Sequence, residues 1–67
     1  MNFSFDELEI IKIFYTDSDT REKLISELKT ILPHVEEIEM TEITQELISK
    51  LETLTDEEFQ QEMGYQN

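Results

Sequence analysis

The chain of 67 residues contains no cysteine and no tryptophan, and it has one glycine and one proline. Without cysteine it can form neither a disulfide nor a zinc–thiolate site, and this absence is typical of a cytosolic protein. No apolar run approaches the roughly 20 residues that a transmembrane helix needs. The first ten residues are acidic where a signal peptide is basic, so we expect a cytoplasmic protein without a leader.

Positive charge is also scarce. Five lysine and arginine residues stand against 17 aspartate and glutamate residues, which gives a net charge of −12 at pH 7. Residues 1–34 hold seven acids and four bases, a net charge of −3, whereas residues 35–67 hold ten acids and one base, Lys50, a net charge of −9. This balance argues against nucleic acid and anionic membrane as ligands, because binding phosphate requires a basic surface.

The acidic half allows two interpretations. A run of like charges is usually a solvated surface that keeps a protein soluble. The same charge also suits docking on a basic protein surface. The carboxylates crowd at Glu36, Glu37, Glu39 and Glu42, and these four residues are the candidate partner-binding site.

The first predicted helix runs from about Ser4 to Phe14. Ser4 and Glu7 form a capping-box pattern, in which a hydroxyl residue is followed by a glutamate three positions later. The apolar residues recur at helical spacing, and we expect Phe5, Leu8, Ile11 and Phe14 to pack in the core. Such a helix has more apolar residues than an interior needs, so some of the others are expected at the surface, as a docking patch or dimer seam: Phe3, Ile10, Ile13 and Tyr15.

The second predicted helix follows a turn at Thr16–Asp19, and Ser18 or Asp19 is expected to cap it. Asp19 and Lys23 are spaced for an ion pair on this helix. Pro33 should end it at about Ile31, because the residue before proline avoids helical geometry.

The third predicted helix is the stretch Met40–Leu54, and the rest of the chain is expected to cover its apolar stripe. The stripe consists of Met40, Ile43, Leu47, Leu51 and Leu54. Glu46 and Lys50 are spaced for an ion pair on the same helix.

A second capping box, Thr55 to Glu58, predicts a short fourth helix. Phe59 and Met63 should face inward, and Gly64 stands where a C-cap glycine belongs. A disordered tail is expected over residues 64–67. The predicted fold is therefore all-α, a small bundle of three short helices plus a short fourth C-terminal helix, in a single domain spanning residues 1–67.

Catalytic and metal-binding patterns are weak. His34 lies in a proline loop without a nucleophile placed nearby by the sequence. Asp17-Ser18-Asp19 resembles the start of a calcium-binding loop, but Glu22 and Leu28 stand where that loop needs glycine and glutamate. We therefore expect no enzyme activity, no catalytic residues, no cofactor and no metal site.

Two alternative functions involve nucleic acid, and only one of them stays open. A DNA-reading helix-turn-helix is rejected, because the helix that would read DNA carries glutamates beside Gln45, Ser49 and Lys50. The converse idea, an acidic DNA mimic that inhibits a DNA-binding protein or restriction nuclease, stays open.

Several ordered segments carry a family resemblance: Phe3-Ser-Phe-Asp-Glu7, Ile13-Phe-Tyr15, Thr20-Arg21, Leu24-Ile-Ser-Glu-Leu28, Leu32-Pro33, Lys50-Leu51 and Leu54-Thr-Asp-Glu-Glu-Phe59. In this order and spacing the chain resembles the transposon-transfer assisting protein family, small acidic proteins of Firmicutes conjugative transposons. The resemblance implies a few short helices, a bacterial cytosolic setting and a non-catalytic accessory role in transfer. It brings no assigned binding residues. Together with the charge, it leads us to expect docking on a basic protein of the mobile element or host.

Overall fold

The computed structural model describes residues 3–15 and 20–64. In chain order the elements are α1 (Phe5–Phe14), α2 (Arg21–Ile31), a short 3₁₀ helix η1 (Leu32–His34), α3 (Ile38–Thr53) and α4 (Asp56–Gly64). The described residues form helices and connections without a strand. The predicted all-α class is confirmed.

Side-chain caps begin three of the helices. Both predicted capping boxes are present: Ser4 Oγ accepts from Glu7 N at 3.2 Å, and Thr55 Oγ1 accepts from Glu58 N at 3.1 Å. The predicted cap of α2 is wrong. Thr20, rather than Ser18 or Asp19, is the N-cap, and its Oγ1 accepts from Lys23 N at 3.1 Å. A threonine hydroxyl can also accept from a first-turn amide group. The predicted Asp19–Lys23 pair and the Thr16–Asp19 turn lie outside the described residues.

The helix ends follow the proline and the short loops. α2 ends at Ile31, as Pro33 predicts, and the chain continues through η1. α3 spans Ile38–Thr53, so it begins earlier than the predicted start at Met40. Gly64 is the last residue of α4, which corrects the start of the predicted tail; residues 65–67 lie outside the described part of the chain.

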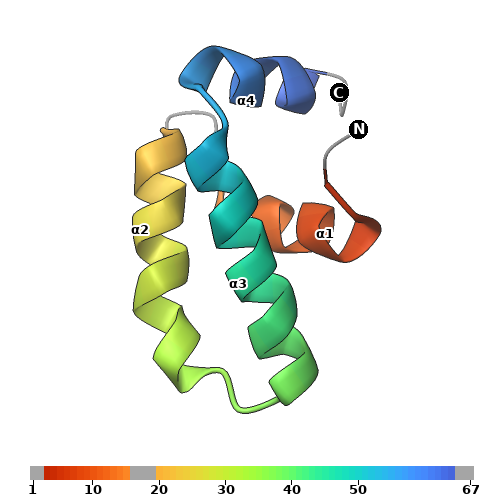
Figure 1. Ribbon diagram of the computed structural model, residues 1–67, viewed down its shortest axis with the longest axis vertical. Helices are drawn as coiled ribbons and strands as arrows, with labels where there is room; N and C mark the ends of the chain where they lie inside the picture. The colour runs from red at the N-terminus through yellow and green to blue at the C-terminus, as the bar shows by residue number, and fades with distance from the viewer. Residues whose placement is uncertain (1–2, 16–19, 65–67) are drawn as a thin grey trace.

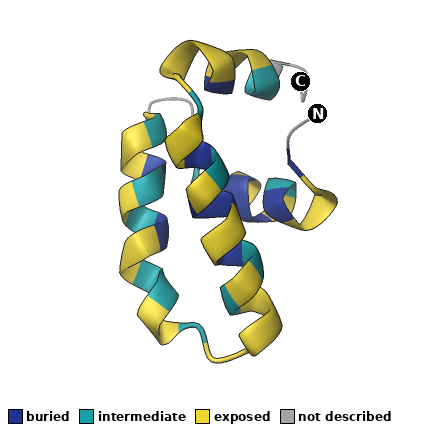
Figure 2. Cartoon of the chain, viewed as in Figure 1, coloured by how far each residue is buried: buried dark blue, intermediate teal, exposed yellow. Residues whose placement is uncertain are grey.

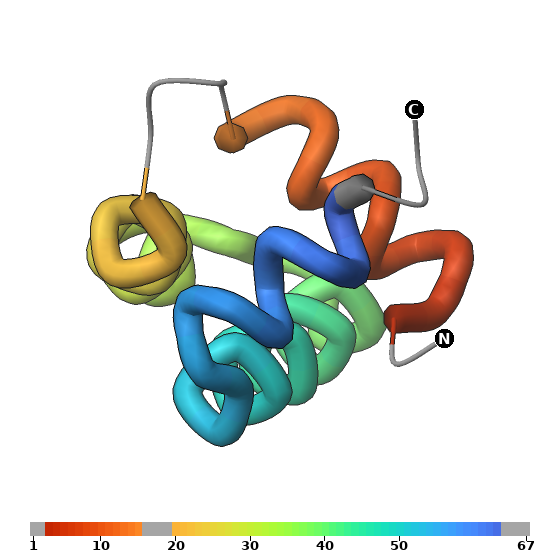
Figure 3. The backbone as a smooth tube through the Cα atoms, turned by 90° about the horizontal axis from the view of Figure 1, so that it is seen from above, coloured from red at the N-terminus to blue at the C-terminus, as the bar shows by residue number. Residues whose placement is uncertain are grey.

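α2 and α3 form an antiparallel hairpin, closed by η1 and residues 35–37 (Figure 1). α1 packs against both helices of the hairpin, and α4 lies across the end where α2 begins and α3 ends (Figures 1 and 3). Within the predicted bundle, α2 and α3 are therefore the antiparallel pair, while α1 and α4 cross them. No helix in the described segments is long and apolar enough to traverse a bilayer.

The core lies where the four helices meet, and the buried residues line the inner faces in Figure 2. Its buried apolar members are Phe3, Ile10, Ile11, Leu24, Leu28, Leu47, Ile48, Leu51 and Phe59. Phe59 anchors α4 there, and its ring makes an edge contact with Tyr15 at a centroid distance of 5.2 Å. The predicted inward position of Phe59 is confirmed, and Met63 packs against the same cluster.

One expectation about the apolar residues of α1 is wrong, and another holds for one residue of its set. Phe5 is 75% exposed instead of packing in the core, because the face of α1 that carries Glu7 and Ile11 points inward and Phe5 lies opposite. Phe3 and Ile10 are buried, whereas Ile13 is exposed as expected. Phe3 precedes the N-cap, the position whose apolar side chain commonly packs back on the first turns of a helix.

The apolar stripe of α3 was expected to be covered along its whole length. The structure covers only its middle and C-terminal part. Leu47 and Leu51 are fully buried, and Ile43 and Leu54 pack against the core at half-buried positions. Met40, one turn nearer the start of the helix, is 37% exposed. The stripe therefore extends beyond the core and leaves an apolar surface at the N-terminal end of α3.

Candidate functional site

The four predicted carboxylates lie where α2 turns into α3, and all are exposed. Glu36 is in the connection, Glu37 is the N-cap residue of α3, and Glu39 and Glu42 follow in its first two turns. The hydroxyl of Thr41 holds this turn by donating to Glu37 O at 2.9 Å and Val35 O at 3.4 Å. Acidic residues are favourable here because the amino end of a helix carries partial positive charge.

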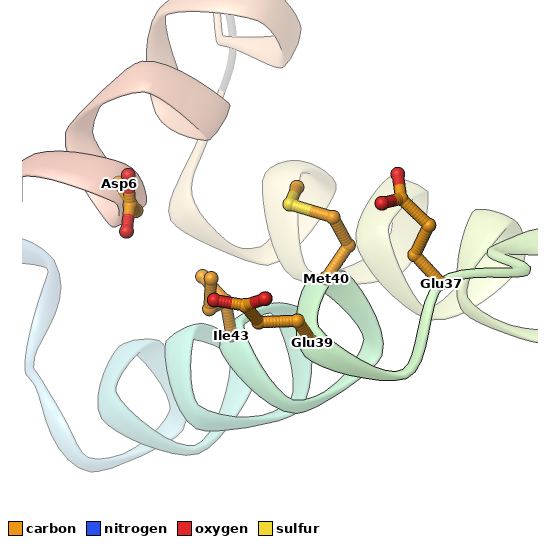
Figure 4. A pocket seen from close by; sticks show the side chains of 5 residues that line it. All are labelled: Asp6, Glu37, Glu39, Met40 and Ile43. Carbon is orange, nitrogen blue, oxygen red and sulfur yellow. The ribbon is translucent and has the colours of Figure 1, made fainter.

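The structure brings two of these carboxylates to one depression. It has a volume of about 260 Å³ and lies between the first turn of α1 and the first turns of α3. Its lining residues are Asp6, Glu37, Glu39, Met40 and Ile43. Figure 4 shows Asp6 above Ile43 and Glu39, with Met40 and Glu37 projecting on the same side of α3. Glu36 and Glu42 are not among the lining residues, so the predicted cluster is only partly one site.

Asp6 and Met40 lie outside the predicted partner-binding site. Met40 is expected in the core stripe, and Asp6 stands in the first turn of α1, where an acidic residue is favourable. Both are exposed at the depression. Sequence spacing contains no signal for the meeting of Asp6 with α3, because the contact depends on how α1 crosses the hairpin.

An ion pair between buried Glu7 of α1 and half-buried Lys50 of α3 holds that crossing. Glu7 is only 1% exposed, and its Oε1 accepts from Ser4 N at 2.7 Å and from Lys50 Nζ at 2.8 Å. The predicted Glu46–Lys50 contact is present but longer, at 3.6 Å. The hydrogen bond from Lys50 to Glu7 raises the pKa of the Lys50 ammonium above its ordinary value. One carboxylate thus caps α1 and attaches it to α3, which brings Asp6 to the depression that Glu39 also lines.

Other basic residues are also used between helices. Arg21 Nε donates to Asp56 Oδ1 at 2.9 Å, and Arg21 Nη1 donates to Leu51 O at 2.8 Å, which joins the start of α2 to the α3–α4 junction. Lys29 Nζ lies 2.8 Å from Glu52 Oε2. Lys50, the single base of residues 35–67, is held by Glu7. The carboxylates at the depression receive no ion pair from any residue that the structure describes.

The depression can attract cationic groups. It is smaller than the roughly 300–1,000 Å³ of typical small-molecule pockets. Its carboxylates surround two apolar side chains, Met40 and Ile43. Within the described segments, no three His, Cys, Asp or Glu side chains are grouped so that they could hold a metal ion. His34 is exposed on η1.

Comparison with known proteins gives one family. The family described as "Putative transposon-transfer assisting protein" matches residues 3–63. No curated protein and no solved structure matches the chain. The family match covers α1, α2, α3 and all but the last residue of α4, and it includes the lining residues of the depression. The chain belongs to the transposon-transfer assisting protein family.

Proposed function

We propose that this protein is a non-catalytic accessory factor in the transfer of a conjugative transposon, and that it acts by docking its acidic surface on a basic partner protein. The family description supports the role in transfer. The observation that carries the docking proposal is the set of exposed carboxylates at the α2–α3 turn: Glu36, Glu37, Glu39 and Glu42. The partner is a basic protein of the mobile element or of the host.

The distribution of the basic residues supports this proposal. Three of the five basic side chains pair with acids on other helices, so they serve the fold rather than neutralise the α2–α3 turn. A surface with unneutralised charge attracts an oppositely charged protein over a distance and orients it before contact. That attraction weakens as salt screens the charges.

Capture of partners from cells that carry the element tests the proposal. Tagged protein is incubated with the lysate at low salt and washed at high salt. We expect one basic protein of the element, such as a relaxase, integrase or regulator, to be retained at low salt and released by the wash. Retention of nothing at low salt would contradict docking and leave the charge as a solubility feature.

Charge-reversed variants give the matched control. In one variant the four carboxylates of the turn are replaced by lysine, as Glu36→Lys, Glu37→Lys, Glu39→Lys and Glu42→Lys. In the other, four carboxylates elsewhere are replaced: Glu9→Lys, Glu22→Lys, Glu27→Lys and Glu57→Lys. Both variants change the net charge equally. We expect only the first to lose the partner while both keep helical circular dichroism, and equal retention by both would contradict the site.

The DNA-mimic alternative gives a different result in the same experiment. A mimic occupies the DNA-binding cleft of its target, so duplex DNA would compete with it and the captured protein would be a nuclease or another DNA-binding protein. An accessory factor that docks elsewhere leaves DNA binding by its partner intact.

A further inference from the structure

We propose that the depression between α1 and α3 seats an apolar side chain from a basic, amphipathic segment of the partner, with lysines or arginines on either side of that side chain contacting Asp6, Glu37 and Glu39. The inference rests on the proposed function and specifies the form of the partner. A purely electrostatic contact would use the whole acidic surface, whereas this site requires both an apolar side chain and flanking positive charge.

The apolar part of the site is a continuous feature of α3. Met40 and Ile43 line the depression. Met40 is 37% exposed, although it belongs to the same stripe as Leu47 and Leu51, which are completely buried. A methionine adapts its shape to different apolar partners and recurs on surfaces that bind peptides. Covering this apolar surface would remove it from water, which favours association.

The size of the depression favours a side chain over a whole small molecule. Its volume of about 260 Å³ is below the range of typical small-molecule pockets, and it is open to solvent. Ile38 at the start of α3 is 77% exposed, and Phe5 beside Asp6 is 75% exposed. These side chains extend the apolar surface at the two helix starts that meet at the depression, which suits a segment longer than one residue.

The charge around the depression selects a basic segment and disfavours a second copy of this chain. Asp6 approaches from α1 while Glu37 and Glu39 approach from α3, so carboxylates stand on both sides of Met40 and Ile43 (Figure 4). A second copy would bring another surface from a chain of net charge −12 against them, and like charges brought together oppose association. Lysine or arginine next to an apolar residue would pair with these carboxylates.

Two matched peptides test the inference at physiological salt. In the first peptide, leucines recur at helical spacing and lysines fill positions between them. In the second, every leucine is replaced by serine, so that its charge is identical. Binding is followed by the amide and methyl NMR signals of the full chain. We expect the leucine peptide to shift the signals of Asp6, Met40 and Ile43, and the serine peptide to bind at least about tenfold more weakly.

Variants with equal charge locate the site. Glu39→Gln removes a carboxylate at the depression, and Glu42→Gln removes one from the next turn outside it. We expect Glu39→Gln to weaken binding of the leucine peptide several-fold more than Glu42→Gln. Met40→Ser should weaken it as well, while Ile13→Ser, an exposed apolar residue near the C-terminal end of α1 and outside the lining residues, is its control.

The outcomes separate this inference from the proposed function. Equal affinity for the two peptides, equal effects of the two glutamine variants, or signal shifts spread over the whole acidic surface would overturn the inference and leave electrostatic docking intact. Failure of the leucine peptide to bind would overturn the inference too. The proposed function fails instead when the lysate capture retains no basic partner.

Discussion

At the residue scale, Glu7 has two roles that the sequence presents as one. Its place in the Ser4 capping box is readable from spacing, because both residues lie within one turn. Its contact with Lys50 joins positions 43 residues apart, and it accounts for the burial of a carboxylate in this small core. A buried charge is tolerated when it is paired and hydrogen-bonded. Oε1 of Glu7 accepts from the backbone amide of Ser4 and from the ammonium group of Lys50.

The first prediction concerns the loss of the Lys50 ammonium group. Lys50→Met leaves Glu7 buried without its ionic partner, so the free energy of unfolding should fall by about 1–3 kcal/mol. Adding Glu7→Gln should recover part of that loss, because glutamine still accepts from Ser4 N and carries no charge. Urea denaturation of the two single variants and the double variant measures the coupling. Strictly additive losses would mean that the pair does not stabilise the fold.

The second prediction concerns alkaline pH. The pKa of Lys50 is raised in the folded state by its hydrogen bond to Glu7, so the folded chain holds this proton more tightly than the unfolded chain does. The resulting stability is complete below the ordinary lysine pKa of about 10.4 and is lost as pH rises through the folded-state pKa. Urea denaturation at about pH 9 and about pH 11 should show this loss, and Lys50→Met should show a smaller one. An equal loss in the variant would contradict the assignment to Lys50.

At the element scale, the hydroxyl caps set the boundaries between helices. Thr55 ends the turn after α3 and starts α4, with reciprocal hydrogen bonds to Glu58 of 2.9 Å and 3.1 Å. α4 then holds Phe59 in the core. The stability of α4 therefore depends on a cap at one end and one aromatic anchor in the first turn.

The third prediction tests the cap. Thr55→Ala should lower the free energy of unfolding by about 1 kcal/mol, because it leaves the amide group of Glu58 without its acceptor. Thr53→Ala is the control, since Thr53 is an exposed threonine in the last turn of α3 whose hydroxyl donates to Lys50 O at 2.8 Å and accepts from no first-turn amide group. Thermal or urea denaturation of both variants gives the difference. A loss as large for Thr53→Ala would indicate that the capping bond contributes little.

The helices were predictable from the sequence to a greater extent than their arrangement. Capping boxes and Pro33 mark boundaries through contacts within a few residues, and these predictions hold for α1, α4 and the end of α2. The crossing of α1 over the hairpin depends on Glu7 meeting Lys50, and neither charge reveals its partner in the sequence. Glu37 and Glu39 were predictable as an acidic cluster because they are close in the sequence. Asp6 was not predictable as part of the same site, because it comes from another helix.

Apolar periodicity also predicted core membership only in part. It identifies a face of a helix, but the extent of that face that is covered depends on where the neighbouring helices end. Met40 continues the stripe of α3 and remains 37% exposed, because the stripe extends beyond the core. This exposed continuation is the apolar surface on which the proposed docking of a basic segment depends.

At the scale of the whole molecule, charge and compactness oppose each other. The Cα radius of gyration is 11.3 Å, close to the roughly 11 Å expected for a compact chain of this length. A net charge of −12 is confined to this volume, and the pairs of Arg21, Lys29 and Lys50 offset it only at the contacts between helices. Repulsion among the remaining carboxylates should lower the stability of the fold.

The fourth prediction follows from that repulsion. The melting temperature should rise between about 0.01 M and about 0.15 M sodium chloride, because the screening length falls from about 30 Å to about 8 Å. Circular dichroism at a range of salt concentrations measures it. A melting temperature that is independent of salt would mean that the charges are too well separated to affect folding.

A mating assay tests whether the acidic surface at the α2–α3 turn assists transfer. The gene is deleted from the element, and transfer frequency is measured after complementation with the wild type, with the lysine variant of Glu36, Glu37, Glu39 and Glu42, or with the control lysine variant of Glu9, Glu22, Glu27 and Glu57. Cellular levels of each protein are compared by immunoblot. We predict that the wild type and the control restore transfer and that the turn variant does not. Full restoration by the turn variant, at the same protein level, would contradict the account.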